Sequence, residues 1–124
     1  MTSYDDPDDV LARIQQDVAT AQRRAEQARQ AQEAIAAVRG TGRSPRGEVT
    51  VEVDAAGALR DLQLTDGALQ YRARDLEAMI LEAVRVAQHD AAARAIAVAE
   101  DAWGEGDPAV EHLRAELQER QAAR

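Results

Sequence analysis

The sequence contains no cysteine, no phenylalanine and no lysine. Without cysteine it forms no disulfide and offers no thiolate, which agrees with a reducing compartment. All 15 of its Lys and Arg residues are arginine. Because 28 of the 124 residues are alanine, the 45% hydrophobic share overstates the core, since hydrophobic stabilisation scales with buried apolar area. We therefore expect one domain with a thin core that an oligomeric partner completes.

Segments and clusters that mark a membrane protein or an enzyme are equally scarce. No apolar run approaches the roughly 18 residues of a membrane span. The start MTSYDDPDDV lacks the basic and apolar regions of a secretory signal, so we expect a soluble, cytoplasmic protein. His89 and His112 stand apart from other metal ligands, and no serine lies near a plausible base. We expect no catalytic residue, no metal, no cofactor and no small-molecule substrate.

The first third of the chain predicts one long helix, capped by Asp8 or Asp9 and running to about Ala37. Its mostly apolar positions repeat every seven residues in two phases, which is typical of a coiled-coil seam. The two phases are Leu11, Val18, Ala25 and Gln32, and Ile14, Ala21, Ala28 and Ile35. Alanine in the middle of the seam would let a partner helix approach closely.

A small sheet is predicted next, because the segment GEVTVEVD alternates apolar and polar residues. A second strand follows the reversal Ala55-Ala56-Gly57. Within it Leu62 and Leu64 alternate properly, whereas Leu59 is out of phase and indicates a turn or a bulge. Residues 38–44 could add an edge strand, giving an antiparallel meander of two or three strands. We interpret Gly40, Gly42 and Gly47 as turn and bulge glycines, since no helix start follows them as it would in a nucleotide loop.

The last half predicts two more helices. Asp75 would cap a long helix ending near Trp103, and Asp107-Pro108 would begin a short third helix. The predicted buried stripe of the long helix is Leu76, Met79, Ile80, Ala83, Val84, Ala87, Ala91, Ala95 and Val98. The fold class is therefore α+β: long helix, small meander, long helix, short helix. A helix of 30 residues is about 45 Å long, but a seven-residue strand spans about 23 Å, so the helices must project beyond the sheet and need a partner, most simply a second copy.

This ordered pattern resembles the YbaB/EbfC family of small bacterial nucleoid-associated proteins. The residues that carry the resemblance are Val38, Gly40, Gly47, Val49, Val51, Val53, Gly57, Leu62, Leu64, Leu76, Glu77, Ala83, Ala87 and Ala91. The resemblance spans roughly residues 8–100, which divides the chain into a family-like domain of residues 1–103 and a C-terminal helical extension of residues 104–124. It implies a tweezer-like homodimer in the nucleoid, with paired sheets, projecting helical arms and little preference for DNA sequence.

A basic ribbon is the candidate DNA contact. Residues 38–47 hold three arginines and no acid in a chain of net charge -8. Arginines there would contact phosphates with little sequence preference, and the ribbon would form the sheet edge at which two copies pair. The candidate DNA-binding residues are Arg39, Arg43 and Arg46, joined by Arg23, Arg24 and Arg29 if these line the same cleft. The arginines could instead protect a strand edge from aggregation, or bind an acidic protein.

A second function remains open, that of a protein-interaction module. The resemblance extends to actinobacterial relatives encoded near type VII secretion genes, which look like partner-binding proteins. Such a module would use the alanine-rich helices and the third helix. Trp103 either packs on Val110 and Leu113 or anchors a partner. The predicted dimer or partner interface consists of Leu11, Ile14, Val18, Ile35, Val49, Val51, Val53 and Trp103.

Overall fold

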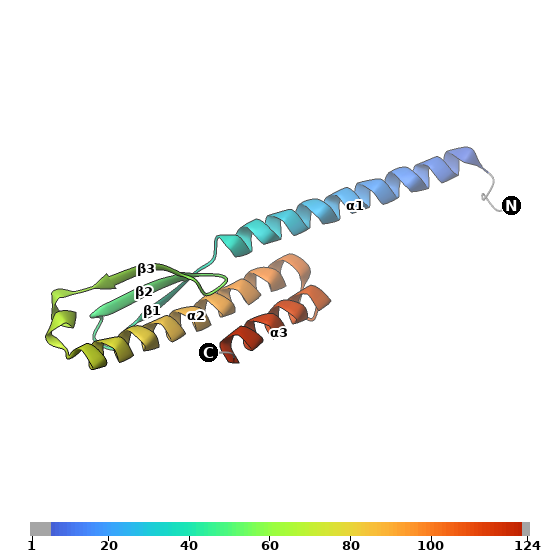
Figure 1. Ribbon diagram of the computed structural model, residues 1–124. Helices are drawn as coiled ribbons and strands as arrows, with labels where there is room; N and C mark the ends of the chain where they lie inside the picture. Colours follow the sequence, from blue (N-terminus) through green and yellow to red (C-terminus); the bar gives the residue numbers. More distant parts are fainter. Residues whose placement is uncertain (1–5, 123–124) are drawn as a thin grey trace.

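The computed structural model describes residues 6–122 and has the predicted α+β order. The elements are α1 (Pro7–Ala36), β1 (Arg39–Arg43), β2 (Val49–Asp54), β3 (Leu59–Leu64), the short 3₁₀ helix η1 (Asp66–Gln70), α2 (Ala73–Trp103) and α3 (Pro108–Ala122) (Figure 1). The strands form one antiparallel sheet in the order β1-β2-β3, which confirms the three-stranded form of the predicted meander. None of the helices within the described residues has the length and apolar character that a membrane crossing requires.

The helix starts follow the predicted chemistry only in part. Asp6 caps α1, because its carboxylate accepts the backbone N–H of Asp8 at 3.0 Å. The predicted caps Asp8 and Asp9 lie instead in the first turn, where acids favour the helix dipole. For α3 the prediction holds, since the Asp107 carboxylate accepts the N–H of Ala109 at 2.9 Å.

The start of α2 differs from the prediction. This helix begins at Ala73, and its N-cap residue Arg72 makes no side-chain cap hydrogen bond. Asp75, the predicted cap, lies in the first turn. The end agrees with the sequence, because Gly104 follows Trp103 with φ +92°, a backbone conformation that only glycine adopts freely.

The valines of β2 form the centre of the core. Val49, Val51 and Val53 are fully buried, as their alternation predicted. In the β2–β3 register Val51 lies opposite Leu62, and a shift between Glu52 and Val53 places Leu59 opposite Val53. The irregularity predicted at Leu59 is therefore a bulge. Residues opposite each other in an antiparallel pair point to the same face, so the leucines of β3 share the face of the valines.

Helix α2 lies against β1 and β2 and approaches β1 unusually closely (Figure 1). Its buried alanines include Ala83, Ala87 and Ala91, spaced by four residues as predicted. A Cβ atom on Gly42 would lie 1.9 Å from the carbonyl oxygen of Ala83, and one on Gly40 would lie 2.2 Å from that of Ala87. These two glycines therefore serve close packing, and our interpretation of them as turn glycines is wrong.

The turn interpretation holds for Gly47, whose φ is +77°. It lies in the connection between β1 and β2, where the backbone N–H of Gly47 donates to the carbonyl oxygen of Ser44. Glycine is favoured there because L-residues with a side chain rarely adopt positive φ.

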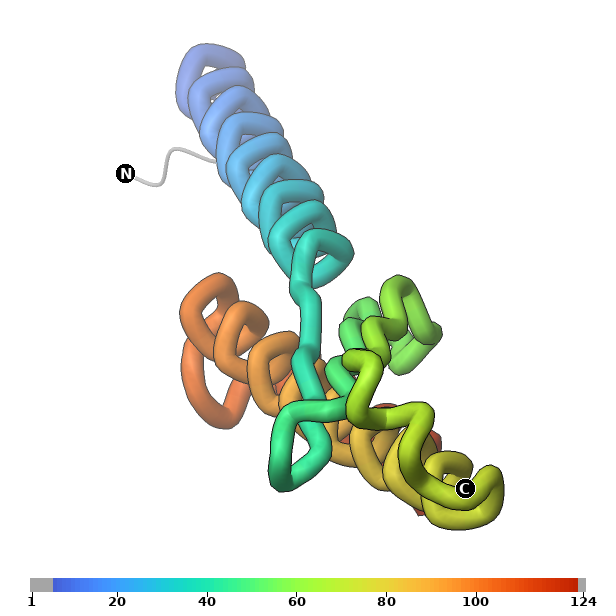
Figure 2. The backbone as a smooth tube through the Cα atoms, turned by 90° about the vertical axis from the view of Figure 1, so that its left-hand side faces the viewer, coloured from blue at the N-terminus to red at the C-terminus, as the bar shows by residue number. Residues whose placement is uncertain are grey.

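Helix α1 projects away from the rest of the molecule (Figure 1, Figure 2). Residues 6–18 are exposed along their whole length. Near its C-terminal end α1 packs against the end of α2, where Ala31 is buried and the Gln27 amide donates to the carbonyl oxygen of Ala102. The predicted projection beyond the sheet is thus seen in α1.

Helix α3 folds back along α2 (Figure 1). Val110 is fully buried, and Leu117 joins a cluster with Ala92 and Ala95 of α2. Trp103 itself is half-buried. The extension therefore covers a face of α2 that would otherwise expose alanine and isoleucine.

Candidate nucleic-acid interface

The six predicted DNA-binding arginines lie in two separate regions of the chain. Strand β1 begins beside the end of α1 with Arg39 and ends with Arg43, just before the β1–β2 turn that contains Arg46. Four residue steps along a strand separate Arg39 from Arg43 by roughly 13 Å. The other three arginines lie on α1, on the far side of Arg39. A single chain therefore does not unite the six in one patch.

Arg39 holds the junction between α1 and β1. Its guanidinium donates to the carbonyl oxygens of Ala36 at 3.0 Å and Val38 at 2.9 Å, and the residue is half-buried. The last carbonyls of a helix lack partners within the helix, so Arg39 satisfies groups that would otherwise need water. This local role leaves it less available to a phosphate than an exposed arginine.

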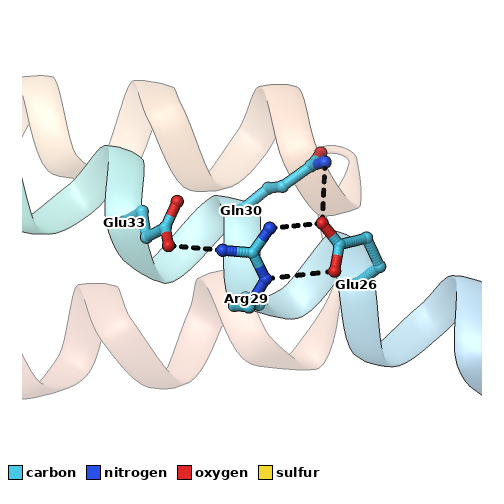
Figure 3. Close-up of polar contacts among 4 residues, drawn as sticks. All are labelled: Glu26, Arg29, Gln30 and Glu33. Atoms are coloured by element: carbon cyan, nitrogen blue, oxygen red, sulfur yellow. Dashed lines mark hydrogen bonds and ion pairs between the residues drawn. The ribbon is translucent and has the colours of Figure 1, made fainter.

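Arg29 is neutralised by its neighbours on α1 (Figure 3). Its guanidinium forms ion pairs with Glu26 and Glu33, one turn away on either side. Gln30 also donates to the Glu26 carboxylate at 3.2 Å. The hydrogen bond from Arg29 lowers the pKa of Glu26 below its usual value, so Glu26 stays charged at neutral pH and keeps this arginine paired.

Arg23 and Arg24 are the two predicted DNA-binding arginines of α1 that keep an exposed charge. Arg23 donates to the hydroxyl of Thr20 at 3.2 Å, a neutral partner that leaves its charge in place. Both residues are exposed, and no ion pair involves either of them within residues 6–122.

Arg43 and Arg46 flank the β1–β2 turn and are both exposed. The turn is held by Ser44, whose buried hydroxyl accepts the N–H of Val49 at 3.0 Å. Together with Pro45 and Gly47, the two arginines line a shallow, open hollow. A rigid turn that presents two cations can contact a polyanion without losing much backbone entropy.

A hydrogen bond ties this turn to the start of α2. The Tyr71 hydroxyl donates to the Glu48 carboxylate at 2.5 Å. The bond lowers the pKa of the Glu48 carboxyl and raises the pKa of the Tyr71 hydroxyl. Glu48 is therefore ionised and Tyr71 protonated at neutral pH, which keeps the link intact.

Sequence reasoning missed two arginines that this link places nearby. Arg72 follows Tyr71 directly, and Arg74 lies in the first turn of α2. Both are exposed, and the start of α2 on which they lie is at the same end of the sheet as the β1–β2 turn (Figure 1). The sequence signal for these two arginines is the segment YRAR, residues 71–74, which by itself indicates only a connector between the sheet and the next helix.

The outer edge of β1 is partly blocked against pairing with another strand. The Asp90 carboxylate on α2 accepts the outward backbone N–H of Thr41 at 2.9 Å and also the Arg94 guanidinium at 3.1 Å. An edge amide that is already bonded cannot pair with another strand. Sheet pairing through the ribbon, as the sequence suggested, would first have to break the Asp90 contact.

The predicted interface residues separate into exposed and enclosed sets. Leu11, Ile14 and Val18 on α1 are 53%, 53% and 51% exposed, whereas Ile35 is half-buried. These exposed side chains follow the predicted coiled-coil seam.

The three valines behave differently from that interface prediction. Val49, Val51 and Val53 are enclosed by α2 within the chain, so they form its core and are closed to a second copy. The open apolar residues of the sheet are instead Leu59, Leu62 and Leu64 of β3, at 52%, 40% and 41% exposure. They are left uncovered because α2 packs on β1 and β2 and hardly reaches β3.

Comparison with known proteins agrees with this architecture. The sequence model described as the YbaB/EbfC DNA-binding family matches residues 11–106, from the first turns of α1 to the glycines after α2. No curated protein matches the chain. The match bears out the resemblance seen in the sequence, and α3 lies outside it.

Proposed function

Because the chain belongs to the YbaB/EbfC DNA-binding family, we propose that it binds double-stranded DNA as a nucleoid-associated homodimer. The role is non-enzymatic and belongs to the cytoplasmic nucleoid. Binding runs through the phosphate backbone and is tolerant of sequence, since phosphate contacts carry no base information. The observation that carries this proposal is the set of exposed arginines that form no ion pair within residues 6–122, in a chain of net charge -8.

The six predicted arginines contribute unequally to the proposed contact. Arg23, Arg24, Arg43 and Arg46 keep their charges exposed, whereas Arg39 and Arg29 have partners within the chain. The net charge of -8 repels DNA at long range. Cellular salt screens such repulsion beyond roughly 8 Å, so a local cationic patch still acts at contact distance. We therefore expect weak binding that fades as salt is added.

Uncovered apolar surface supports the homodimer. Leu11, Ile14 and Val18 form a stripe on the part of α1, residues 6–18, that is exposed along its whole length, and the leucines of β3 form a second open set. Leaving so many large apolar side chains in water forfeits their hydrophobic stabilisation. A second copy would cover both sets.

The alternative, a protein-interaction module, draws less support from the fold. The alanines of α2 that it would use are buried against the chain's own β1 and α3. Helix α3 is likewise engaged through Val110 and Leu117. The stripe on α1 supports contact with a protein, and a second copy of the chain satisfies that requirement.

Fluorescence anisotropy of a labelled duplex of about 30 base pairs tests the DNA proposal, with the protein titrated at low and near-physiological salt. We expect saturable binding that weakens with salt and is equal for scrambled sequences. Absence of binding at low salt would refute the proposal and turn attention to a protein partner.

A further inference from the structure

The arginines of the described chain divide by whether they have an ionic partner. Arginines with a carboxylate within 4.0 Å are Arg29, Arg85, Arg94, Arg114 and Arg120. The arginines of residues 6–122 that form no ion pair there are Arg13, Arg23, Arg24, Arg39, Arg43, Arg46, Arg60, Arg72 and Arg74. An unpaired, exposed guanidinium is free to replace a counterion on a phosphate.

Four of these arginines, Arg43, Arg46, Arg72 and Arg74, lie on two segments that the fold joins. The Tyr71–Glu48 hydrogen bond joins the segment before α2 to the start of β2, and the N–H of Thr65 donates to the Glu48 carbonyl at 2.9 Å. Arg46 lies close enough to influence the pKa of both Tyr71 and Glu48. The two segments that carry these four arginines are therefore held together by this link, with Arg46 beside it.

Charge along the molecule is strongly uneven. Residues 43–48 and 71–74 together hold four arginines and one acid, Glu48, which is bonded to Tyr71. Asp66 and Asp75 border this cluster. At the other end of α2 and along α3 acids predominate: Glu100, Asp101, Glu105, Asp107, Glu111, Glu116 and Glu119. Such a separation orients the basic end toward a polyanion and turns the acidic end away from it.

We propose that the main DNA-contacting surface is this end of the sheet, with Arg72 and Arg74 acting beside Arg43 and Arg46 as phosphate ligands. We name these four residues the sheet-end cluster. The inference rests on the proposed DNA-binding function and assigns its site to the sheet end, in place of the α1 arm. On α1, Arg29 is neutralised, and the exposed arginines of this helix that form no ion pair within residues 6–122 are Arg13, Arg23 and Arg24.

The test compares three double variants that each remove two positive charges, using anisotropy with the same duplex over a range of salt. Arg72→Gln/Arg74→Gln probes the sheet-end cluster, and Arg23→Gln/Arg24→Gln probes the arm. Arg85→Gln/Arg120→Gln is the matched control, because both residues are exposed and pair with acids on their own helices. All three lower the net charge equally, so a difference among them reports the position of the contact.

We expect Arg72→Gln/Arg74→Gln to flatten the slope of log affinity against log salt by about one for each phosphate whose arginine partner is removed. At about 0.1 M salt its affinity should fall roughly tenfold for each such phosphate. Arg72→Lys/Arg74→Lys should retain most of the binding, since lysine still serves as a point charge for phosphate. That rescue, with unchanged melting of all variants, would separate charge from folding.

Two results would overturn the inference: one would refute only the site, and the other would refute the proposed function as well. If the arm variant loses affinity while Arg72→Gln/Arg74→Gln keeps the wild-type salt slope, DNA binding stands but its site is the arm. If the wild-type protein shows no salt-sensitive binding at all, the proposed function fails and the site assignment falls with it.

Discussion

Replacing Gly42 by alanine tests the closest contact in the molecule. The added Cβ would lie 1.9 Å from the carbonyl oxygen of Ala83 and 2.7 Å from the backbone nitrogen of Ala87. Both obstacles are backbone atoms of α2, so no side-chain rotation relieves the clash. Carbon atoms approach non-bonded neighbours favourably at about 3.5 Å. Strand β1 and helix α2 would therefore have to separate by roughly 1.5 Å.

That separation reduces packing along the main contact of the core. Overpacking usually costs about 1–3 kcal/mol when side chains can adjust. Because backbone must move here, and the packing around Ala83, Ala87 and Ala91 loosens with it, we expect the free energy of unfolding to fall by about 3–5 kcal/mol. A domain at the lower end of ordinary stability, about 5 kcal/mol, would be left marginal or unfolded.

Urea unfolding followed by circular dichroism measures this change as a lower midpoint at constant slope, with all proteins at one concentration so that oligomerisation is matched. Gly67→Ala is the matched control. A Cβ at Gly67 meets only the Thr65 hydroxyl at 3.6 Å and the Glu48 side chain at 3.9 Å, so the same substitution should be nearly neutral. A destabilisation below about 1 kcal/mol for Gly42→Ala would refute the close approach of β1 to α2.

Three further predictions concern the sheet edge, α3 and the arm. The N–H of Thr41 lowers the pKa of Asp90 below its usual value of 3.8, so the carboxylate stabilises the fold above about pH 4 and this stabilisation is lost as the pH falls lower. The unfolding free energy of Asp90→Asn should therefore depend less on pH between about 5 and 3 than that of the wild type, and equal dependence would contradict the contact. Val110→Asp would bury an unpaired charge, so α3 should detach and limited proteolysis should cleave near residues 104–107 while the sheet domain resists; unchanged cleavage would argue against the docking of α3. Ile14→Asp should shift the proposed dimer to monomer in light scattering, whereas Gln16→Asp on the outer face of α1 should not; equal behaviour would remove the stripe from the interface.

The order of elements could be predicted from the sequence because it depends on neighbours along the chain. The alternation of Val49, Val51 and Val53 defines β2, and the misplaced Leu59 marks the bulge. The pair Asp107-Pro108 marks the start of α3. Such signals act over a few residues, through hydrogen bonds and side-chain periodicity, so they survive without knowledge of the fold. The cap of α2 was less predictable, since Asp75 could serve as a cap or as a first-turn acid.

The candidate site depends on contacts between residues far apart in the chain. Nothing local shows that Gly40 and Gly42 must admit α2, because the obstacle comes from Ala83 and Ala87 more than 40 positions later. Arg29 is an exception, because its partners Glu26 and Glu33 lie within one helical turn along the chain.

The sheet-end cluster shows this limit most directly. Its members come from two segments of the sequence, and the hydrogen bond between Tyr71 and Glu48 holds those segments together across 23 residues. Local patterns established the helices, the strands and a basic ribbon. The link between the segment of Arg72 and Arg74 and the strand that follows the ribbon exists only in the folded chain, and electrostatic contacts depend on distance in space and not on separation along the chain.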